Sequence, residues 1–79
     1  MNNAYLRKIV SDEFRELLMF AGLVNDYHCK TKVEAGKDTH YTFNTIIGEC
    51  KVFSPKRIYI KDKSYKSLRE ARFELYRYL

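Results

Sequence analysis

The sequence predicts an α+β fold with an N-terminal helix, a three- to four-stranded antiparallel meander, and a C-terminal helix packed on one face of the sheet. Three observations predict it. Apolar residues recur at steps of three and four near both ends of the chain, apolar and polar residues alternate in the middle, and short turn segments separate the alternating runs. With 79 residues, 3 Gly and 1 Pro, we expect a single domain over residues 1–79.

The first predicted element is a helix over residues 4–23. Its apolar face is formed by Leu6, Ile9, Val10, Phe14, Leu17, Ala21 and Val24. The opposite face carries charges that we expect to be solvated, namely Arg7, Lys8, Asp12 and Arg15. Asn3 is a candidate N-cap and Gly22 a candidate helix end. The same residues also allow a short turn followed by a helix that Ser11 caps.

The middle of the chain predicts the strands of the meander. Residues 27–33 alternate with period two and indicate a half-buried strand whose outer face carries His28, Lys30 and Lys32. Residues 34–38 supply a turn, and residues 39–47 form the second strand of a hairpin. A turn at 48–49 leads to a third strand at 50–53, and residues 58–60 continue the sheet. Pro55 marks a bulge or an edge, because it has no backbone N–H to donate.

The C-terminal helix has the clearest local signal. Ser67 and Glu70 form a capping box, in which the two side chains satisfy free amides at a helix start. We expect the helix to run from there to the C-terminus. Its apolar stripe consists of Leu68, Ala71, Leu75 and Leu79, widened by Tyr76 and Tyr78.

Composition narrows the class of protein. The longest mostly apolar run, residues 17–24, is shorter than the ~20 residues that cross a bilayer, and residues 1–5 lack the features of a signal peptide. We therefore expect a cytoplasmic protein with no membrane partner and with Cys29 and Cys50 reduced. A net charge of +5 and a pI near 9.3 favour acidic partners.

The sequence predicts neither a metal site nor an enzyme. His28, Cys29, His40 and Cys50 are zinc-ligand types, but neighbouring residues on a strand point to opposite faces and no paired C-x-x-C or H-x-x-x-H spacing occurs. A catalytic thiol would need a lowered pKa, an oriented base and a pocket, and no phosphate-binding glycine loop is present. We expect a binding module without a cofactor.

Basic residues interleaved with aromatic ones indicate that the binding module recognises nucleic acid. They surround the first hairpin and the approach to the last helix, at Lys30, Lys32, Lys37, Lys51, Lys56, Arg57, Lys61, Lys63 and Lys66. Such a density can neutralise several phosphates and release their counterions. Lysines on edge strands also prevent aggregation, so solubility alone is the competing explanation.

The element order, with Tyr27 opening the first strand, Gly36 and His40 around the first turn, and a basic start to the last helix, resembles the double-stranded RNA-binding domain. The resemblance implies that Lys37 and His40 enter a minor groove of a duplex. It also implies that phosphates are held by Lys66, Arg69 and Arg72. The sequence departs from the family in the three residues between Gly36 and His40 and in the added length of residues 54–63.

A protein-binding role is the alternative. In size and in Lys, Tyr and Asn content the chain resembles small phage-encoded inhibitors or adaptors of a partner protein. Met19 and Phe73 fall off the apolar stripes of their helices and are candidate anchors for such a contact or for a homodimer. Salt separates the two hypotheses, because it weakens an electrostatic contact steeply and an apolar one little.

Overall fold

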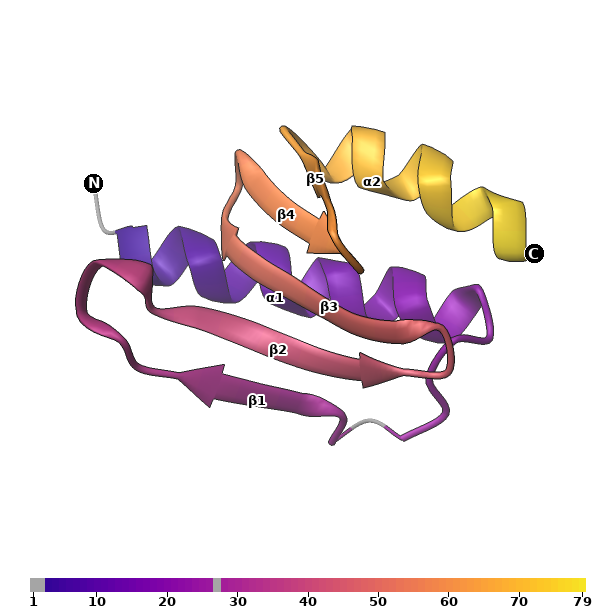
Figure 1. Cartoon of the computed structure of the whole chain (residues 1–79), viewed down its shortest axis with the longest axis horizontal. Helices are drawn as coiled ribbons and strands as arrows, with labels where there is room; N and C mark the ends of the chain where they lie inside the picture. The colour runs from indigo at the N-terminus through magenta and orange to yellow at the C-terminus, as the bar shows by residue number, and fades with distance from the viewer. Residues whose placement is uncertain (1–2, 27) are drawn as a thin grey trace.

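The two ends of the chain are helical and the middle is an antiparallel sheet (Figure 1), which confirms the predicted fold class. The structure is a computed structural model that describes residues 3–26 and 28–79. Helix α1 (Asn3–Phe20) precedes the sheet in the chain, and helix α2 (Leu68–Leu75) follows it. A 3₁₀ turn, η2 (Tyr76–Tyr78), comes after α2. The meander has five strands in sequence order, β1 (Lys30–Val33), β2 (His40–Thr45), β3 (Gly48–Ser54), β4 (Arg57–Ile60) and β5 (Lys63–Tyr65), and a 3₁₀ turn, η1 (Gly36–Asp38), joins the first two.

Helix α1 is one continuous helix. Its last helical residue is Phe20, and Gly22 caps the end: its φ of +75° suits a residue without a Cβ atom, and the amides of Gly22 and Leu23 bond back to the carbonyls of Met19 (3.0 Å) and Leu18 (2.9 Å). This pairing satisfies the last carbonyls of the helix. The alternative start at Ser11 is wrong, since Ser11 is buried within the helix. Asn3 is itself helical rather than the cap before the helix, and the preceding residue lies outside the described part of the chain.

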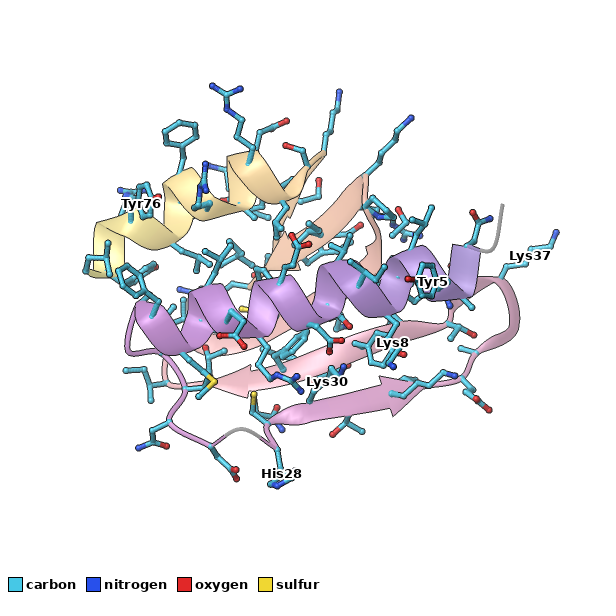
Figure 2. All side chains as sticks on the ribbon, turned by 180° about the vertical axis from the view of Figure 1, so that it is seen from behind. Tyr5, Lys8, His28, Lys30, Lys37 and Tyr76 are labelled. Carbon is cyan, nitrogen blue, oxygen red and sulfur yellow. The ribbon has the colours of Figure 1, made fainter. Side chains whose placement is uncertain are left out.

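The buried face of α1 differs from the prediction at Arg15. This residue was expected in solvent, but only 8 % of it is exposed. The reason is a polar cluster beneath β1, where Lys30 Nζ lies 2.6 Å from Asp12 Oδ1 and Arg15 Nη2 lies 3.3 Å from the same oxygen. Figure 2 shows Lys30 between α1 and β1. The carboxylate compensates both cations, which allows their stems to cover the edge of the core.

Strand β1 therefore presents the opposite face to that predicted. Lys30 pairs in register with Phe43, a core residue, so Lys30 and Lys32 point to the helix side and Thr31 and Val33 to the other. The prediction of a basic outer face on this strand was wrong. Tyr27, where the strand was expected to begin, lies outside the described residues.

The second hairpin turn lies two residues earlier than predicted. Thr45 pairs with Gly48, so the turn consists of Ile46 and Ile47 although both are apolar. Thr45 Oγ1 donates to the Gly48 carbonyl at 2.6 Å and accepts from Ile47 N at 3.1 Å, and Ile46 N donates to Leu23 O at 3.0 Å. The bond to Leu23 ties the turn to the segment after α1.

The region around Pro55 agrees with the prediction of a bulge. The register between β3 and β4 shifts between Val52 and Ser54, and Pro55 then lies in the turn that leads to β4. A second tight turn at Lys61 and Asp62 leads to β5. The short strand β5 was not predicted, and it accounts for the extra length before the last helix.

Helix α2 begins as the capping box predicts. The Glu70 amide donates to Ser67 Oγ at 3.1 Å, and Ser67 has the extended backbone of an N-cap. The α-helix ends at Leu75 and tightens into η2, which turns the last residues away from the core. Tyr76, Tyr78 and Leu79 are consequently exposed, contrary to the predicted stripe. No helix among residues 3–26 and 28–79 is long and apolar enough to cross a bilayer.

Both helices cover the same face of the sheet. Strand register places six side chains on that face, namely Tyr41, Phe43, Cys50, Val52, Ile58 and Ile60. Phe14 and Leu18 of α1 and Ala71 and Leu75 of α2 belong to the same buried cluster. In Figure 1, α1 passes behind β3, and Figure 2 shows it in front of the sheet from the opposite side. The other face of the sheet is covered by neither α1 nor α2.

Candidate functional site

The residues predicted to contact nucleic acid lie in two parts of the fold. Lys37 is exposed in η1 and extends outward from the β1–β2 connection (Figure 2), and His40 opens β2 beside it. Lys66 is exposed before α2, and Arg69 and Arg72 are exposed on it. Among the hollows formed by the described residues, none identified is lined by members of both groups.

The α2 group faces acidic side chains. Arg69 and Arg72 line a hollow of about 300 Å³ between the helices, together with Leu17, Leu68, Glu13 and Glu16. Two carboxylates opposite two guanidinium groups balance the local charge. A phosphate that approaches this hollow is attracted by the guanidinium groups and repelled by the carboxylates, so the net attraction is weak.

The face of the sheet away from the helices carries an aromatic cluster. The rings of His40 and Phe53 are stacked, with centroids 4.4 Å apart and planes at 26°, and the rings of Phe53 and Tyr59 form a T-shaped pair with centroids 5.6 Å apart. The guanidinium carbon of Arg57 lies 4.2 Å from the Phe53 centroid and 5.7 Å from that of Tyr59. His40 comes from β2 and Arg57 from β4, the two neighbours of β3 in the sheet, so they approach Phe53 from opposite sides.

A hollow of about 340 Å³ lies beside this cluster. It is lined by Lys51, Phe53, Arg57, Tyr59, Lys61 and Asp62. Lys51 and Tyr59 face each other across β3 and β4, which explains why a cation and a ring share its wall. Three cations and one carboxylate therefore surround two aromatic rings.

A second hollow, of about 530 Å³, adjoins the first. Its lining comes from the start of α1, from η1 and from the β3–β4 turn: Asn3, Leu6, Arg7, Lys37, Phe53, Ser54, Pro55, Lys56 and Arg57. Phe53 and Arg57 line both hollows, so the two adjoin at these residues, and the start of α1 contributes to the second. Arg7 is fixed there because its Nε donates to the Phe53 carbonyl at 2.9 Å.

We call the six cations and two rings that line these two adjoining hollows the open-face track: Arg7, Lys37, Lys51, Lys56, Arg57, Lys61, Phe53 and Tyr59. Three carboxylates offset part of its charge. Glu49 lies 3.5 Å from Lys51, Asp38 lies 3.6 Å from Arg57, and Asp62 lines the first hollow. Exposed pairs of this kind are weak and exchangeable, so the track remains cationic toward a ligand. A hydrogen bond with Tyr59 raises the pKa of Arg57, which stays charged at any working pH.

His40 adjoins the track through its stack on Phe53. Its Nδ1 lies 2.7 Å from the Asp38 carbonyl oxygen. A carbonyl only accepts, so Nδ1 carries the hydrogen and the ring orientation is fixed. His40 therefore braces Phe53 from the side opposite Arg57.

Site prediction from the sequence missed the rings of the track. Phe53 and Tyr59 were not among the predicted contacts, and Lys51, Arg57 and Lys61 were recognised only as part of a general basic surplus. The alternation of β3 contained a signal: Val52 points to the core, so Lys51 and Phe53 share the other face.

The zinc-ligand types do not converge. His40 points to the face of the sheet away from the helices, whereas Cys50 is fully buried on the helix side. In the part of the chain that the structure describes, no three His, Cys, Asp or Glu side chains gather around a common point. Burial raises the pKa of both the Cys50 and the Cys29 thiols.

The alternative protein-binding residues have unequal positions. Phe73 is 59 % exposed and meets Tyr76 edge to face, with centroids 6.3 Å apart. Met19 is partly buried against the core, so it is a weaker anchor than predicted. Phe20 and Ile46, which were not predicted as contacts, are 73 % and 80 % exposed.

No protein-family model, curated protein or solved structure matches this chain. The order of helix, antiparallel sheet and helix is like that of the double-stranded RNA-binding domain, although the sheet here has five strands. Likeness of element order does not carry function. The function must be argued from the surface itself.

Proposed function

We propose that this domain is a nucleic-acid-binding module and that the open-face track is its binding surface. One observation carries the proposal. Lys51, Arg57 and Lys61 surround the rings of Phe53 and Tyr59 in a hollow on the face that neither helix covers. Cations attract phosphates and release their counterions, while exposed rings stack on bases. Proteins that bind nucleic acid without a groove-reading helix combine these two features.

The neighbouring hollow supports the proposal because it extends the cationic surface. Arg7, Lys37 and Lys56 reach it from α1, η1 and the β3–β4 turn, three separate elements. A backbone that crosses the first hollow has further phosphate partners in the adjoining one. Lys37 thus keeps its predicted role of contacting nucleic acid, in a different setting.

Duplex binding across Lys66, Arg69 and Arg72 is the other mode that the basic residues suggest. All three are exposed, and Arg69 and Arg72 lie one helical turn apart. Glu13 and Glu16 in the same hollow reduce its attraction for phosphate. The open-face track is therefore the stronger candidate, and the α2 group provides a matched comparison in every experiment.

A protein partner is the second candidate function. It is favoured by the exposed aromatic pair Phe73 and Tyr76 and by Phe20, which together offer apolar surface for an inhibitor or adaptor contact. Aromatic residues of this kind are the usual anchors of such contacts.

Fluorescence anisotropy with labelled single-stranded and duplex DNA and RNA at low salt tests the proposal. We expect saturable binding that the variant Arg57→Ala/Lys61→Asn weakens at least tenfold, because two rim cations are lost. Asn is chosen at position 61 because Lys61 has a φ of +60°, which Asn tolerates. The variant Arg69→Ala/Arg72→Ala removes the same charge and should bind like the parent.

Two results would contradict the proposal. If the parent binds none of the four nucleic acids at low salt, the domain is not a nucleic-acid binder. In that case a pull-down from lysate treated with nuclease, using the parent and Phe73→Ala, tests the protein-binding candidate. If only the Arg69/Arg72 variant loses affinity, the binding surface is α2 and not the open-face track.

A further inference from the structure

We infer that the nucleic acid held by the open-face track is single-stranded and that an unpaired base enters the hollow beside Tyr59. The inference rests on the proposed function and specifies its ligand. It is drawn from the arrangement of the rings, the size of the hollow and the placement of the cations around it.

Tyr59 is the ring that a base can reach. His40 and Arg57 approach Phe53 from opposite sides, so Phe53 serves as a support between them. Tyr59 stands at 70° to Phe53 and lines the hollow. A base that enters the hollow meets the Tyr59 ring and the guanidinium group of Arg57, two groups on which bases stack.

Only an unpaired base presents a free face to this site. In a duplex each base is stacked on its neighbours and paired along its edge, so it offers edges to the grooves and no face to a protein ring. The hollow of about 340 Å³ is near the lower end of the roughly 300–1,000 Å³ typical of sites for small molecules. It therefore suits one nucleotide, whereas a duplex would lie outside it on the rim.

The cations are placed for the backbone on either side of such a base. Lys51 and Lys61 lie in the first hollow, and Lys37 and Lys56 lie in the second. Arg57 stands between them and is oriented by Asp38, 3.6 Å away. One strand can thus run from the first hollow into the second, with a base stacked in the first and phosphates facing lysines in both.

The backbone at Lys61 fixes one side of the hollow. Lys61 is the first residue of the β4–β5 turn, and its φ of +60° is a conformation that glycine adopts more easily. Its amide donates to the Glu49 carbonyl at 3.1 Å, which ties the turn to β3. A lysine held in this conformation keeps its cation at the rim before a ligand arrives.

The test compares two single strands that carry equal phosphate charge, one natural and one abasic, and a duplex. We use a single strand of about ten nucleotides, within the usual site sizes, an abasic strand of the same length, and the corresponding duplex. DNA and RNA versions of the natural strand are both measured. We expect the natural single strand to bind about tenfold more tightly than the abasic strand, because stacking is lost with the bases. The duplex should bind more weakly than the natural strand.

Variants of Tyr59 locate the base. Tyr59→Ala should bind the natural strand no better than the parent binds the abasic strand, and its affinity for the abasic strand should be unchanged. Tyr59→Phe keeps the ring and should retain the parent's preference. Tyr76→Ala removes an exposed tyrosine from the end of α2 and serves as the matched control.

The outcomes separate the inference from the proposed function. If the natural and abasic strands bind the parent equally, or the duplex binds more tightly than the single strand, nucleic-acid binding stands and the inference is overturned. If no oligonucleotide binds, the proposed function itself fails. The comparison of natural and abasic strands uses the parent alone, so it decides the question even where Tyr59→Ala does not fold.

Discussion

Removing Lys37 and Lys56 together should roughly halve the salt dependence of nucleic-acid binding. Both lie in the second hollow, and neither forms an ion pair with any residue in the described ranges. Their loss changes the number of phosphates that the open-face track can neutralise. It does not touch the aromatic cluster, because both side chains are exposed at the margin.

The magnitude follows from the charges of the track. Carboxylates within ion-pair distance of Lys51 and Arg57 offset two of its six positive charges, so a net charge of about four is available to neutralise phosphates. For a single strand each neutralised phosphate contributes about 0.7 to the slope of log affinity against log salt, so four give a slope of about −3. The double variant should show about −1.4. Between 50 and 200 mM salt the parent should lose about 50-fold in affinity and the variant about 7-fold.

Anisotropy titrations at four salt concentrations measure both slopes. The variant Arg69→Ala/Arg72→Ala has the same net charge as Lys37→Ala/Lys56→Ala and should keep the parent's slope. An unchanged slope for Lys37→Ala/Lys56→Ala would refute the assignment of the second hollow to the backbone. Equal flattening in both double variants would show that total charge, and not the track, governs binding.

Three further predictions concern the fold. Ser67→Ala should lower the free energy of unfolding by about 1 kcal/mol in a urea titration, because the Glu70 amide loses its acceptor. Ser64→Ala on β5 is the control and should have little effect. Equal effects of the two substitutions would contradict the role of Ser67 as the helix cap. A hydrogen bond from Lys30 lowers the pKa of Asp12, so the stabilising contribution of the Asp12 carboxylate is complete at neutral pH and declines below about pH 5 as the carboxylate protonates. Asp12→Asn should lower the free energy of unfolding by about 1 kcal/mol at pH 7 and flatten the loss of stability in acid. If the stability of the variant falls with pH in parallel with that of the parent, the ion pair is not the cause of the loss. Cys50 is buried, and its burial raises the pKa of the thiol. Mass spectrometry should therefore find Cys50 unmodified by iodoacetamide until urea unfolds the protein. Modification at the rate of a free thiol would contradict the burial of Cys50.

Local chemistry predicted the ends of the elements well. The Ser67 cap and the Gly22 end depend on side chains and amides within a few residues, so the sequence contains all that determines them. The turn at Ile46 and Ile47 was missed because one of its bonds goes to Leu23, more than twenty residues away. Distant partners of this kind leave no local pattern.

The burial of charged side chains also could not be predicted from the sequence. Arg15 was predicted to be solvated from its place on the charged face of the first helix, and Lys30 from its place on the outer face of the first strand. Arg15 is buried and Lys30 partly buried because Asp12 lies between them once β1 packs beside α1. The side chains of β1 also point to the face opposite to the one predicted. The pairing of Lys30 with Phe43 decides which side of β1 faces the helix, and this pairing cannot be seen in the sequence of β1 alone.

The candidate site could be predicted only in part. An excess of basic residues and the exposure of Lys37 follow from composition and turn chemistry. The rings of Phe53 and Tyr59 were read as sheet residues, because the sequence does not say that both helices pack on the same face. Once they do, the alternate side chains of β3 and β4 become surface, and the aromatic and basic residues there form the track.

An NMR titration of the labelled protein with a single-stranded oligonucleotide tests the central claim most directly. Amide and side-chain shifts report which face the ligand touches, and a chain of 79 residues gives well-resolved spectra. The account predicts that the largest changes fall on β3, β4 and η1, at Lys51, Phe53, Arg57, Tyr59 and Lys37. Changes confined to α2 around Arg69 and Arg72, or no changes at low salt, would contradict it.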